Sequence, residues 1–301
     1  MRKIVECVPN FSEGRRKEVI DQIVEAMAIV PDIHVLDVQS DADHNRTVVT
    51  FVGKPEAVEE AAFRGIGKAA ELIDMSLHRG EHPRMGAADV VPFVPIKNVT
   101  VEDCVAMARR LGERVGRELG IPVYLYEEAA TRPERRNLAE VRRGEYEGIK
   151  AEIETKPERT PDFGPQHLGR AGATAIGARL PLIAFNVYLG TDDVEVAKAI
   201  ARAVRHSSGG LRYVKALGLL VKGKAQVSMN LTDYRKTPIH RVMEMIRREA
   251  ECYGVSVVGS EIVGLIPNEA LVEAAEFYLQ LGGLSSHQIL ENRLADLIQQ
   301  G

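Results

Sequence analysis

Hydrophobic and polar positions alternate with two different periods in the first hundred residues of the chain. In two stretches, at about residues 15–30 and 55–73, apolar side chains recur every three or four positions, which predicts amphipathic helices. Between and around them lie short runs rich in β-branched residues, which predict four strands at about residues 3–8, 33–38, 47–52 and 90–96. The predicted order is therefore β-α-β-β-α-β.

The same order of elements returns in the second half of the chain. The patterns there predict strands at about residues 182–189, 211–221, 226–231 and 255–258, and helices at about 194–204 and 237–253. Split βαβ units of this kind form antiparallel sheets covered by helices. We therefore predict an α+β fold with two ferredoxin-like (βαββαβ) subdomains, residues 1–179 and 180–301, and a ligand cleft between them. Two terminal helices, at about 268–281 and 286–299, complete the chain.

Three segments lie between these two repeats of the pattern. A helix at about 101–119 and a strand at about 123–126 extend the first half. Residues 134–156 are highly charged, which predicts helix and surface loops. Residues 161–173 are dense in glycine and proline, which is typical of either a linker between domains or a binding loop.

Composition and charge narrow the class of protein. A chain of 301 residues with 45% hydrophobic content can bury one large core or two smaller ones. The net charge of −4 leaves no global basic field of the kind that attracts nucleic acid. No apolar run is long enough to predict a membrane span or a signal peptide. Three widely spaced cysteines without a CxxC pair favour a cytoplasmic setting over a disulfide framework or a thiolate zinc site.

The densest candidate chemistry lies in the stretch from His78 to Asp89. It combines two imidazoles, two carboxylates and two guanidinium groups with glycine and proline, between a predicted helix and a predicted strand. Loops often carry functional groups, and glycine and proline give them specific backbone shapes. We favour His82 for proton transfer, because an unperturbed imidazole pKa near 6.5 suits that role at neutral pH.

Two other interpretations of this stretch remain open on the pattern alone. Both histidines can be ordinary polar loop residues. The spacing His78-x-x-x-His82 also resembles a zinc pair, but two ligands four apart share a face only in a helix. Gly80 and Pro83 disfavour a helix here, so we predict no metal.

Two further polar segments precede this stretch. Residues 41–46 form a cluster that can be a hydrated hairpin loop or part of a site. Residues 10–14 belong to a predicted turn. The first backbone amides of the predicted helix that follows can hold a carboxylate or another anion.

Six motifs, in order along the chain, resemble the formiminotransferase domain of the glutamate formimidoyltransferase family. They are VECVPNFSEG (residues 5–14), NRTV (45–48), GEHPRMG (80–86), PVYLY (122–126), PDFGP (161–165) and LIAFN (182–186). The resemblance extends from about residue 3 to residue 295. It implies two α/β subdomains with a folate held between them, usually in a homodimer.

The resemblance also implies a reaction. A formimino group passes from N-formimino-L-glutamate to tetrahydrofolate, which gives 5-formiminotetrahydrofolate and L-glutamate in histidine degradation. Some family members continue into a cyclodeaminase domain that removes ammonia from this product. The present chain has no room for one, so we expect a monofunctional enzyme, with a separate cyclodeaminase as a possible partner.

Site residues follow from the matched motifs. His82 corresponds to the family's catalytic acid/base. Arg46 and Arg84 are expected to bind the glutamate carboxylates by bidentate geometry, and we place Asn10 with them as a substrate-binding residue. The segment expected to bind the folate comprises Gly164, Pro165, Gln166, His167, Leu168, Gly169, Arg170, Ala171 and Gly172.

Two departures from the family pattern bear on the chemistry. The family often has Asp-x-Asp before the second strand, with the later acid orienting the histidine, whereas this chain has Gln39 at the later position. An amide can orient an imidazole but does not stabilise imidazolium as a carboxylate does. The segment 164–172 also lacks the aromatic residue found there in some members. Formyl transfer from N-formylglutamate or 5-formyltetrahydrofolate, or folate binding without catalysis, are the alternative functions.

Overall fold

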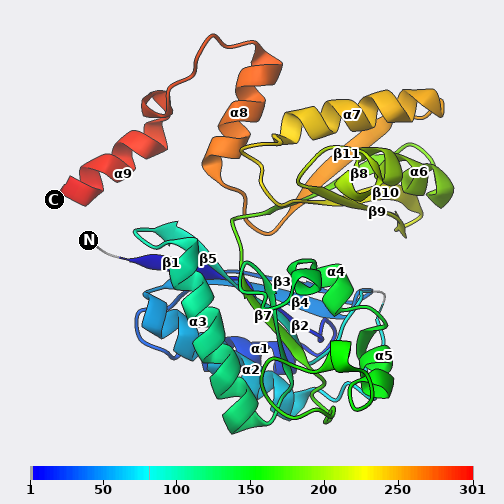
Figure 1. Cartoon of the computed structure of the whole chain (residues 1–301). Helices are drawn as coiled ribbons and strands as arrows, with labels where there is room; N and C mark the ends of the chain where they lie inside the picture. Colours follow the sequence, from blue (N-terminus) through cyan, green and yellow to red (C-terminus); the bar gives the residue numbers. More distant parts are fainter. Residues whose placement is uncertain (1–2, 81, 301) are drawn as a thin grey trace. The chain divides into compact units, whose positions relative to one another are not determined.

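The chain divides into two compact units, residues 1–180 and residues 181–301. The structure is a computed structural model that describes residues 3–80 and 82–300, with side chains up to residue 295. Each unit has its own sheet, its own hydrophobic core and its own covering helices, so the fold is α+β as predicted (Figure 1).

Unit 1 is built on a ferredoxin-like repeat. Its elements are β1 (Ile4–Cys7), α1 (Lys17–Ala28), β3 (His34–Asp41), β4 (Arg46–Gly53), α2 (Pro55–Leu72) and β5 (Ala88–Lys97). The four strands pair in the order β5-β1-β4-β3, and every pair is antiparallel. This confirms the β-α-β-β-α-β order predicted for the first half.

Further elements widen this sheet to seven strands. They are β2 (Asn10–Phe11), α3 (Val101–Arg114), the π-helical η1 (Val115–Leu119), β6 (Val123–Glu127), η2 (Pro133–Arg136), α4 (Leu138–Val141), α5 (Glu145–Glu152), η3 (Pro157–Arg159) and β7 (Thr174–Ala178). The short strand β2 lies between β4 and β5. Strand β7 pairs in parallel with both β5 and β6.

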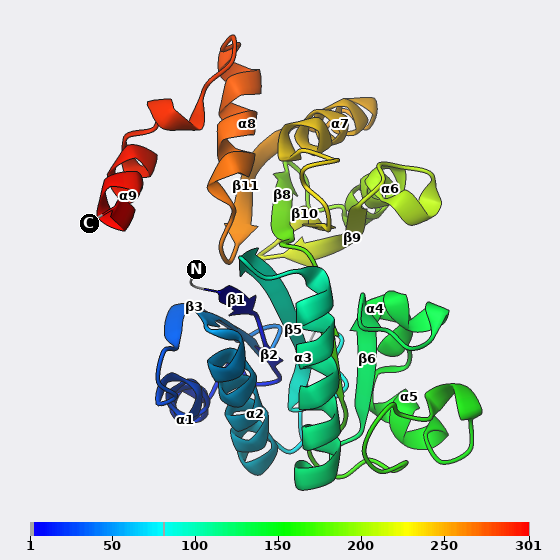
Figure 2. The same cartoon turned by 60° about the vertical axis from the view of Figure 1, so that its left-hand side comes forward.

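Two cores lie on opposite faces of the unit 1 sheet. Helices α1, α2 and α3 cover one face over the larger core, which includes the fully buried Phe51 and Phe93. Helices α4 and α5 flank the β6 end of the sheet, over a smaller core that includes Tyr124 and Tyr126 (Figure 2). The smaller core fixes α4 and α5 relative to the loops that enter β5 and β7.

Unit 2 repeats the ferredoxin-like order. Its elements are β8 (Ile183–Leu189), α6 (Val194–Val204), η4 (His206–Ser208), β9 (Val214–Val221), β10 (Lys224–Leu231), α7 (Ile239–Cys252), β11 (Val257–Val263), α8 (Asn268–Leu279), η5 (Ser286–Gln288) and α9 (Leu290–Gln300). The antiparallel sheet has the order β11-β8-β10-β9. Alternate residues of β8 face a core shared with α6 and α7.

Three sequence-based predictions about unit 1 were incomplete or wrong. Strand β7 was missed, because Ala and Gly fill most of it and give little β propensity. The linker interpretation of residues 161–173 is wrong, since Phe163 pairs with Val123 and the segment leads into β7 within unit 1. Asn10 and Phe11 form β2, where a turn was expected. Across the described residues, no helix combines the length and apolar character needed to cross a bilayer.

Candidate active site

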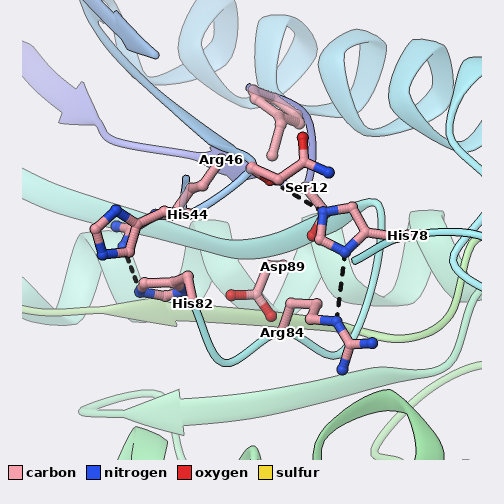
Figure 3. A pocket seen from close by; sticks show the side chains of 9 residues that line it. Ser12, His44, Arg46, His78, His82, Arg84 and Asp89 are labelled. Atoms are coloured by element: carbon pink, nitrogen blue, oxygen red, sulfur yellow. Dashed lines mark hydrogen bonds between the residues drawn. The ribbon is translucent and has the colours of Figure 1, made fainter. Parts of the chain in front are cut away.

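Three loops of unit 1 converge on one small pocket. They are residues 10–14, which comprise β2 and the loop after it, the turn between β3 and β4, and the loop between α2 and β5. The pocket contains about 180 Å³ of space not filled by atoms, and its lining residues are Phe11, Ser12, His44, Asn45, Arg46, His78, His82, Arg84 and Asp89. In Figure 3, His44 and His82 lie on one side of this pocket, His78 and Arg84 on the other, and Asp89 between them.

Asn45 ties the three loops together. Its Oδ1 accepts a hydrogen bond from the Gly14 amide at 2.9 Å, and its Nδ2 donates to the carbonyl of Arg79 at 2.9 Å. Its own carbonyl lies 3.0 Å from Nε2 of His78. The residue has φ of +49°, a left-handed conformation that asparagine adopts more readily than most residues. The turn at residues 41–46, for which the sequence left open a hydrated hairpin loop or part of a site, is therefore a structural part of the pocket.

His82 is held as a neutral imidazole. Nη1 of Arg46 contacts its Nε2. A guanidinium group can only donate, so Nε2 accepts and the ring proton is on Nδ1. Burial and, to a smaller extent, the charges of Arg46 and Arg142 together lower the pKa of His82 to about 2, against the opposing effect of a hydrogen bond with the backbone of Pro83. In this arrangement the ring cannot serve as an acid, because its protonated form is not populated near neutral pH.

Arg46 joins His82 to Asn10. Its Nη2 donates to Oδ1 of Asn10, so three of the predicted site residues are in direct contact. Burial lowers the pKa of Arg46 to about 10, and the charge of Arg142 acts in the same direction. The Nε of Arg46 is buried and has no hydrogen-bond partner within the described part of the chain. This guanidinium group is therefore only partly satisfied.

His78 and Arg84 form a separate cluster on the other side of the pocket. Nε of Arg84 donates to Nδ1 of His78 at 3.4 Å, which leaves the proton of the neutral ring on Nε2, facing Asn45. The terminal nitrogens of Arg84 donate to Glu145 at 2.8 Å and to Glu147 at 2.7 Å. These hydrogen bonds lower the pKa of Glu147 to about 2. Nε and both terminal nitrogens of Arg84 thus donate hydrogen bonds to residues of the protein itself.

The segment 164–172 lies directly against the loop that carries His82. Backbone amides of Met75 and Ala87 donate to the carbonyls of Arg170 and Ala171, each at 2.8 Å. Ala173 donates to the carbonyl of Met85 at 2.9 Å. Most of the segment, from Gly164 to Arg170, is exposed or half-buried. An accessible glycine-rich loop and the loop of the half-buried His82 are therefore joined by backbone hydrogen bonds.

Family comparison identifies the protein class to which this arrangement belongs. The model of the formiminotransferase domain, N-terminal subdomain, matches residues 4–179, and that of the formiminotransferase domain matches residues 184–297. The chain belongs to the formiminotransferase family. The resemblance inferred from the six sequence motifs is confirmed.

Members of the formiminotransferase family match this chain over nearly its full length. The glutamate formimidoyltransferase of Streptococcus pyogenes serotype M1 is 50% identical over 98% of this chain and 99% of its own length. The glutamate formimidoyltransferase of Thermoplasma acidophilum is 54% identical over 97% of both chains. The formimidoyltransferase-cyclodeaminase of Gallus gallus is 49% identical over 93% of this chain and 53% of its own length.

Gln39 stands where the formiminotransferase motif led us to expect an acid. It lies on β3 opposite Val48, and Val48 in turn lies opposite Asn10 on β2. Residues paired across antiparallel strands point to the same face of a sheet. Gln39 and Asn10 therefore belong to one row across the face that also carries Arg46, the neighbour of His82.

Two residues at the site were not predicted from sequence. Asp89, 2% exposed, accepts from the amide of Met85 at 2.8 Å through Oδ1 and pairs with Nη2 of Arg142 through Oδ2. In the sequence, Asp89 is only the last residue of the polar stretch that begins at His78, and no role was predicted for it. Arg142 follows the short helix α4, in the charged segment assigned to surface structure, and no periodic pattern marks it.

The segment that leads into α1 carries its own anion. Oε1 of Glu13 accepts from the amides of Arg15 and Arg16 at 2.9 Å each, and these bonds help to lower the pKa of Glu13 against the effect of burial. A ligand anion at these amides, which residues 10–14 suggested, would have to displace Glu13. Apart from Glu81, which lies outside the described residues, no three His, Cys, Asp or Glu side chains gather as a metal site would require.

Proposed function

We propose that this chain is a glutamate formimidoyltransferase. The donor is N-formimino-L-glutamate, the acceptor is tetrahydrofolate, and the products are 5-formiminotetrahydrofolate and L-glutamate, as in histidine degradation. The observation that carries this proposal is the match, at 50% and 54% identity and over nearly full length, to two proteins named glutamate formimidoyltransferase. The pocket around His82 supplies residues suited to the chemistry.

His82 is proposed to move the protons of the transfer. N5 of tetrahydrofolate attacks the formimino carbon, and the resulting tetrahedral intermediate loses a proton from N5. The bond from this carbon to the glutamate nitrogen then breaks, and that nitrogen gains a proton. One imidazole can accept the first proton and deliver the second, so no net proton is consumed. Holding both substrates beside this ring removes much of the entropic barrier of a two-substrate reaction.

Arg46 couples donor binding to the basicity of His82 in this proposal. While Nη1 of Arg46 donates to Nε2 of His82, that nitrogen cannot take a proton from N5. A carboxylate is a stronger acceptor for a guanidinium group than a neutral imidazole is. A donor carboxylate would therefore draw Arg46 away, free Nε2 and reduce the positive charge that opposes protonation. Asn10, which already accepts a hydrogen bond from Arg46, would keep the guanidinium group of Arg46 beside the donor carboxylate.

The Arg46→Met variant tests this coupling through the pKa of His82. In the unliganded wild-type protein, His82 should remain neutral and show no titration between about pH 8 and pH 5, because its folded pKa lies far below the usual value near 6.5. Removing Arg46 removes a positive charge, so the pKa should rise toward 6.5 and the ring should gain a proton as the pH falls.

Histidine NMR resonances followed against pH give this measurement. The signal of His82 is assigned by its loss in His82→Asn. Arg143→Met is a suitable control, since the Arg143 side chain is 70% exposed and pairs with Glu140. Titration of His82 near its usual pKa in the wild-type protein would contradict the proposed coupling.

The folate is proposed to bind along residues 164–172. This segment is accessible, rich in glycine, and joined by backbone hydrogen bonds to the loop that carries His82. Arg84, proposed from the motif as a second carboxylate ligand, would first have to release Glu145 and Glu147. We propose that it contributes chiefly by fixing the loop, through His78 and α5. The proposal requires no metal.

Three further features of the proposal rest on the family resemblance. The enzyme would work as a homodimer, in the cytoplasm, and would pass 5-formiminotetrahydrofolate to a separate cyclodeaminase. The sparse cysteines without a CxxC pair agree with a reducing compartment. Sedimentation of the purified protein would measure the oligomeric state directly.

Donor competition tests the proposed reaction. The purified protein is supplied with tetrahydrofolate and either N-formimino-L-glutamate or N-formyl-L-glutamate, and a third reaction pairs 5-formyltetrahydrofolate with glutamate. Chromatography of the folates should show that 5-formiminotetrahydrofolate forms in the reaction with N-formimino-L-glutamate. The rate of this reaction should lie far above the rates of the two formyl reactions. A faster formyl reaction would replace the proposed donor, and folate binding without turnover of any donor would support a binding protein instead.

A further inference from the structure

Arg142 caps the end of α4 and pairs with Asp89, which lines the pocket that contains His82. Its amide closes the last turn of α4 on Leu138, and its side chain is 14% exposed. Nη2 pairs with Asp89, while Nε is buried and has no hydrogen-bond partner in the described ranges, residues 3–80 and 82–300. Like Arg46, it is a guanidinium group whose hydrogen-bonding capacity is only partly used.

Among the residues that the structure describes, positive charge exceeds buried negative charge around Arg46 and Arg142. Arg142 lies close enough to lower the pKa of both His82 and Arg46. Asp89 is committed to Arg142 and to a backbone amide. Asp41, the other carboxylate that acts on Arg46, is more than half exposed and is bonded to His44 at 2.9 Å. A buried surplus of cations is unfavourable until an anion enters.

The positive charge of Arg84, in contrast, is balanced by carboxylates of the protein. Each of its terminal nitrogens already donates to a carboxylate of α5. Of Arg46, Arg84 and Arg142, the two with unused hydrogen-bonding capacity are therefore Arg46 and Arg142. The donor of the proposed reaction carries two carboxylates, one on the α carbon and one at the end of the side chain.

We propose that Arg142 is a donor-binding residue that accepts one carboxylate of the formimino donor, while Arg46 accepts the other. This inference rests on the proposed function, because it takes the glutamate-derived donor from it. Two guanidinium groups near one base would select a dicarboxylate over donors that carry a single carboxylate. The second positive charge near His82 would also be neutralised only when the correct donor is bound.

Kinetics of Arg142→Met and Arg142→Lys test the proposal. A charge-assisted hydrogen bond to a carboxylate contributes enough that its loss should raise KM for N-formimino-L-glutamate about 10- to 100-fold. KM for tetrahydrofolate, which also carries carboxylates, should change less than about 3-fold. The lysine variant keeps a charge beside Asp89 but lacks the planar fork, so it should fall between wild type and the methionine variant. A rise in KM for tetrahydrofolate instead would overturn the assignment to the donor.

Truncated donors separate binding from a structural effect. N-formimino-4-aminobutanoate lacks the α-carboxylate, and N-formimino-2-aminobutanoate lacks the side-chain carboxylate. One of these donors lacks the carboxylate that Arg142 is proposed to bind. With that donor, wild type and Arg142→Met should give similar kcat/KM. An equal loss with both truncated donors would mean that Arg142 only supports the fold, and would overturn the proposal.

Controls keep these outcomes distinct from folding defects and from failure of the proposed reaction. Arg142→Met leaves Asp89 buried without its partner, so the double variant Arg142→Met/Asp89→Asn serves where the single one is unstable. Arg143→Met, at the exposed neighbouring position, should keep KM for the donor within about 2-fold. If wild type transfers no formimino group, the proposed function fails. If wild type is active and Arg142→Met keeps its donor KM, only the role of Arg142 fails.

Discussion

Replacing His82 with asparagine is expected to lower kcat about 100- to 10,000-fold, the range typical for loss of a general acid/base. Asparagine is the least disruptive replacement, because its Oδ1 can still accept the hydrogen bond that Nε2 now accepts from Arg46. The pocket should therefore keep its shape while it loses the group that moves protons. Because binding and proton transfer use different groups, the affinity for tetrahydrofolate should change less than about 3-fold.

Steady-state kinetics and folate titration of the same preparation measure both effects. His34→Asn is a matched control, since His34 is an exposed residue at the start of β3 and lies outside the pocket. It should keep the wild-type kcat. Unchanged turnover in His82→Asn would remove His82 from the mechanism, and a lost folate affinity would make it a binding residue.

The repeated βαββαβ order could be predicted because its elements have strong and different periods. Residues 15–30 and 55–73 repeat their apolar positions every three or four residues, and the structure has α1 and α2 there. Strand β7 carried no such signal. It is buried along its whole length between β5 and β6, so its small residues fit a crowded position and do not alternate with polar ones.

The site could be predicted only where a local motif held its residues. His82, Arg46 and Asn10 fall in three matched motifs, and the structure brings them into contact although 36 positions separate Arg46 from each of the other two. The partners of Arg84 lie 61 and 63 residues away, in a charged segment with no recognisable pattern. Arg142 belongs to the same segment. Tertiary pairing decides which arginine is already satisfied and which is not, and no spacing in the sequence encodes that difference.

Backbone contacts at Gly86 join the loop that carries His82 to residues 164–172. Its neighbours Met85 and Ala87 are hydrogen-bonded to Ala173 and Ala171, and Gly86 forms an isolated bridge with Gly172. The carbonyl of Gly86 also accepts from Oγ of Ser12 at 2.8 Å. A Cβ atom at position 86 would lie 1.9 Å from the carbonyl oxygen of Ala173, which no side-chain rotation can relieve. Any larger residue must therefore separate the loops.

Gly86→Ala is expected to destabilise unit 1 by roughly 3 kcal/mol or more, at or above the usual range for overpacking. The loop that carries His82 would move relative to residues 164–172, and a displacement of about 1 Å can lower turnover on the order of 100-fold. Gly67→Ala is the control, because this residue lies in α2, outside the pocket, and a Cβ there meets only side-chain atoms of Leu119 at ordinary contact distances of 3.7 and 3.8 Å. Urea unfolding and the rate of 5-formiminotetrahydrofolate formation should separate the two variants. Equal stability and equal turnover would show that the two loops do not need to meet at Gly86 for the proposed folate-binding segment to act together with His82.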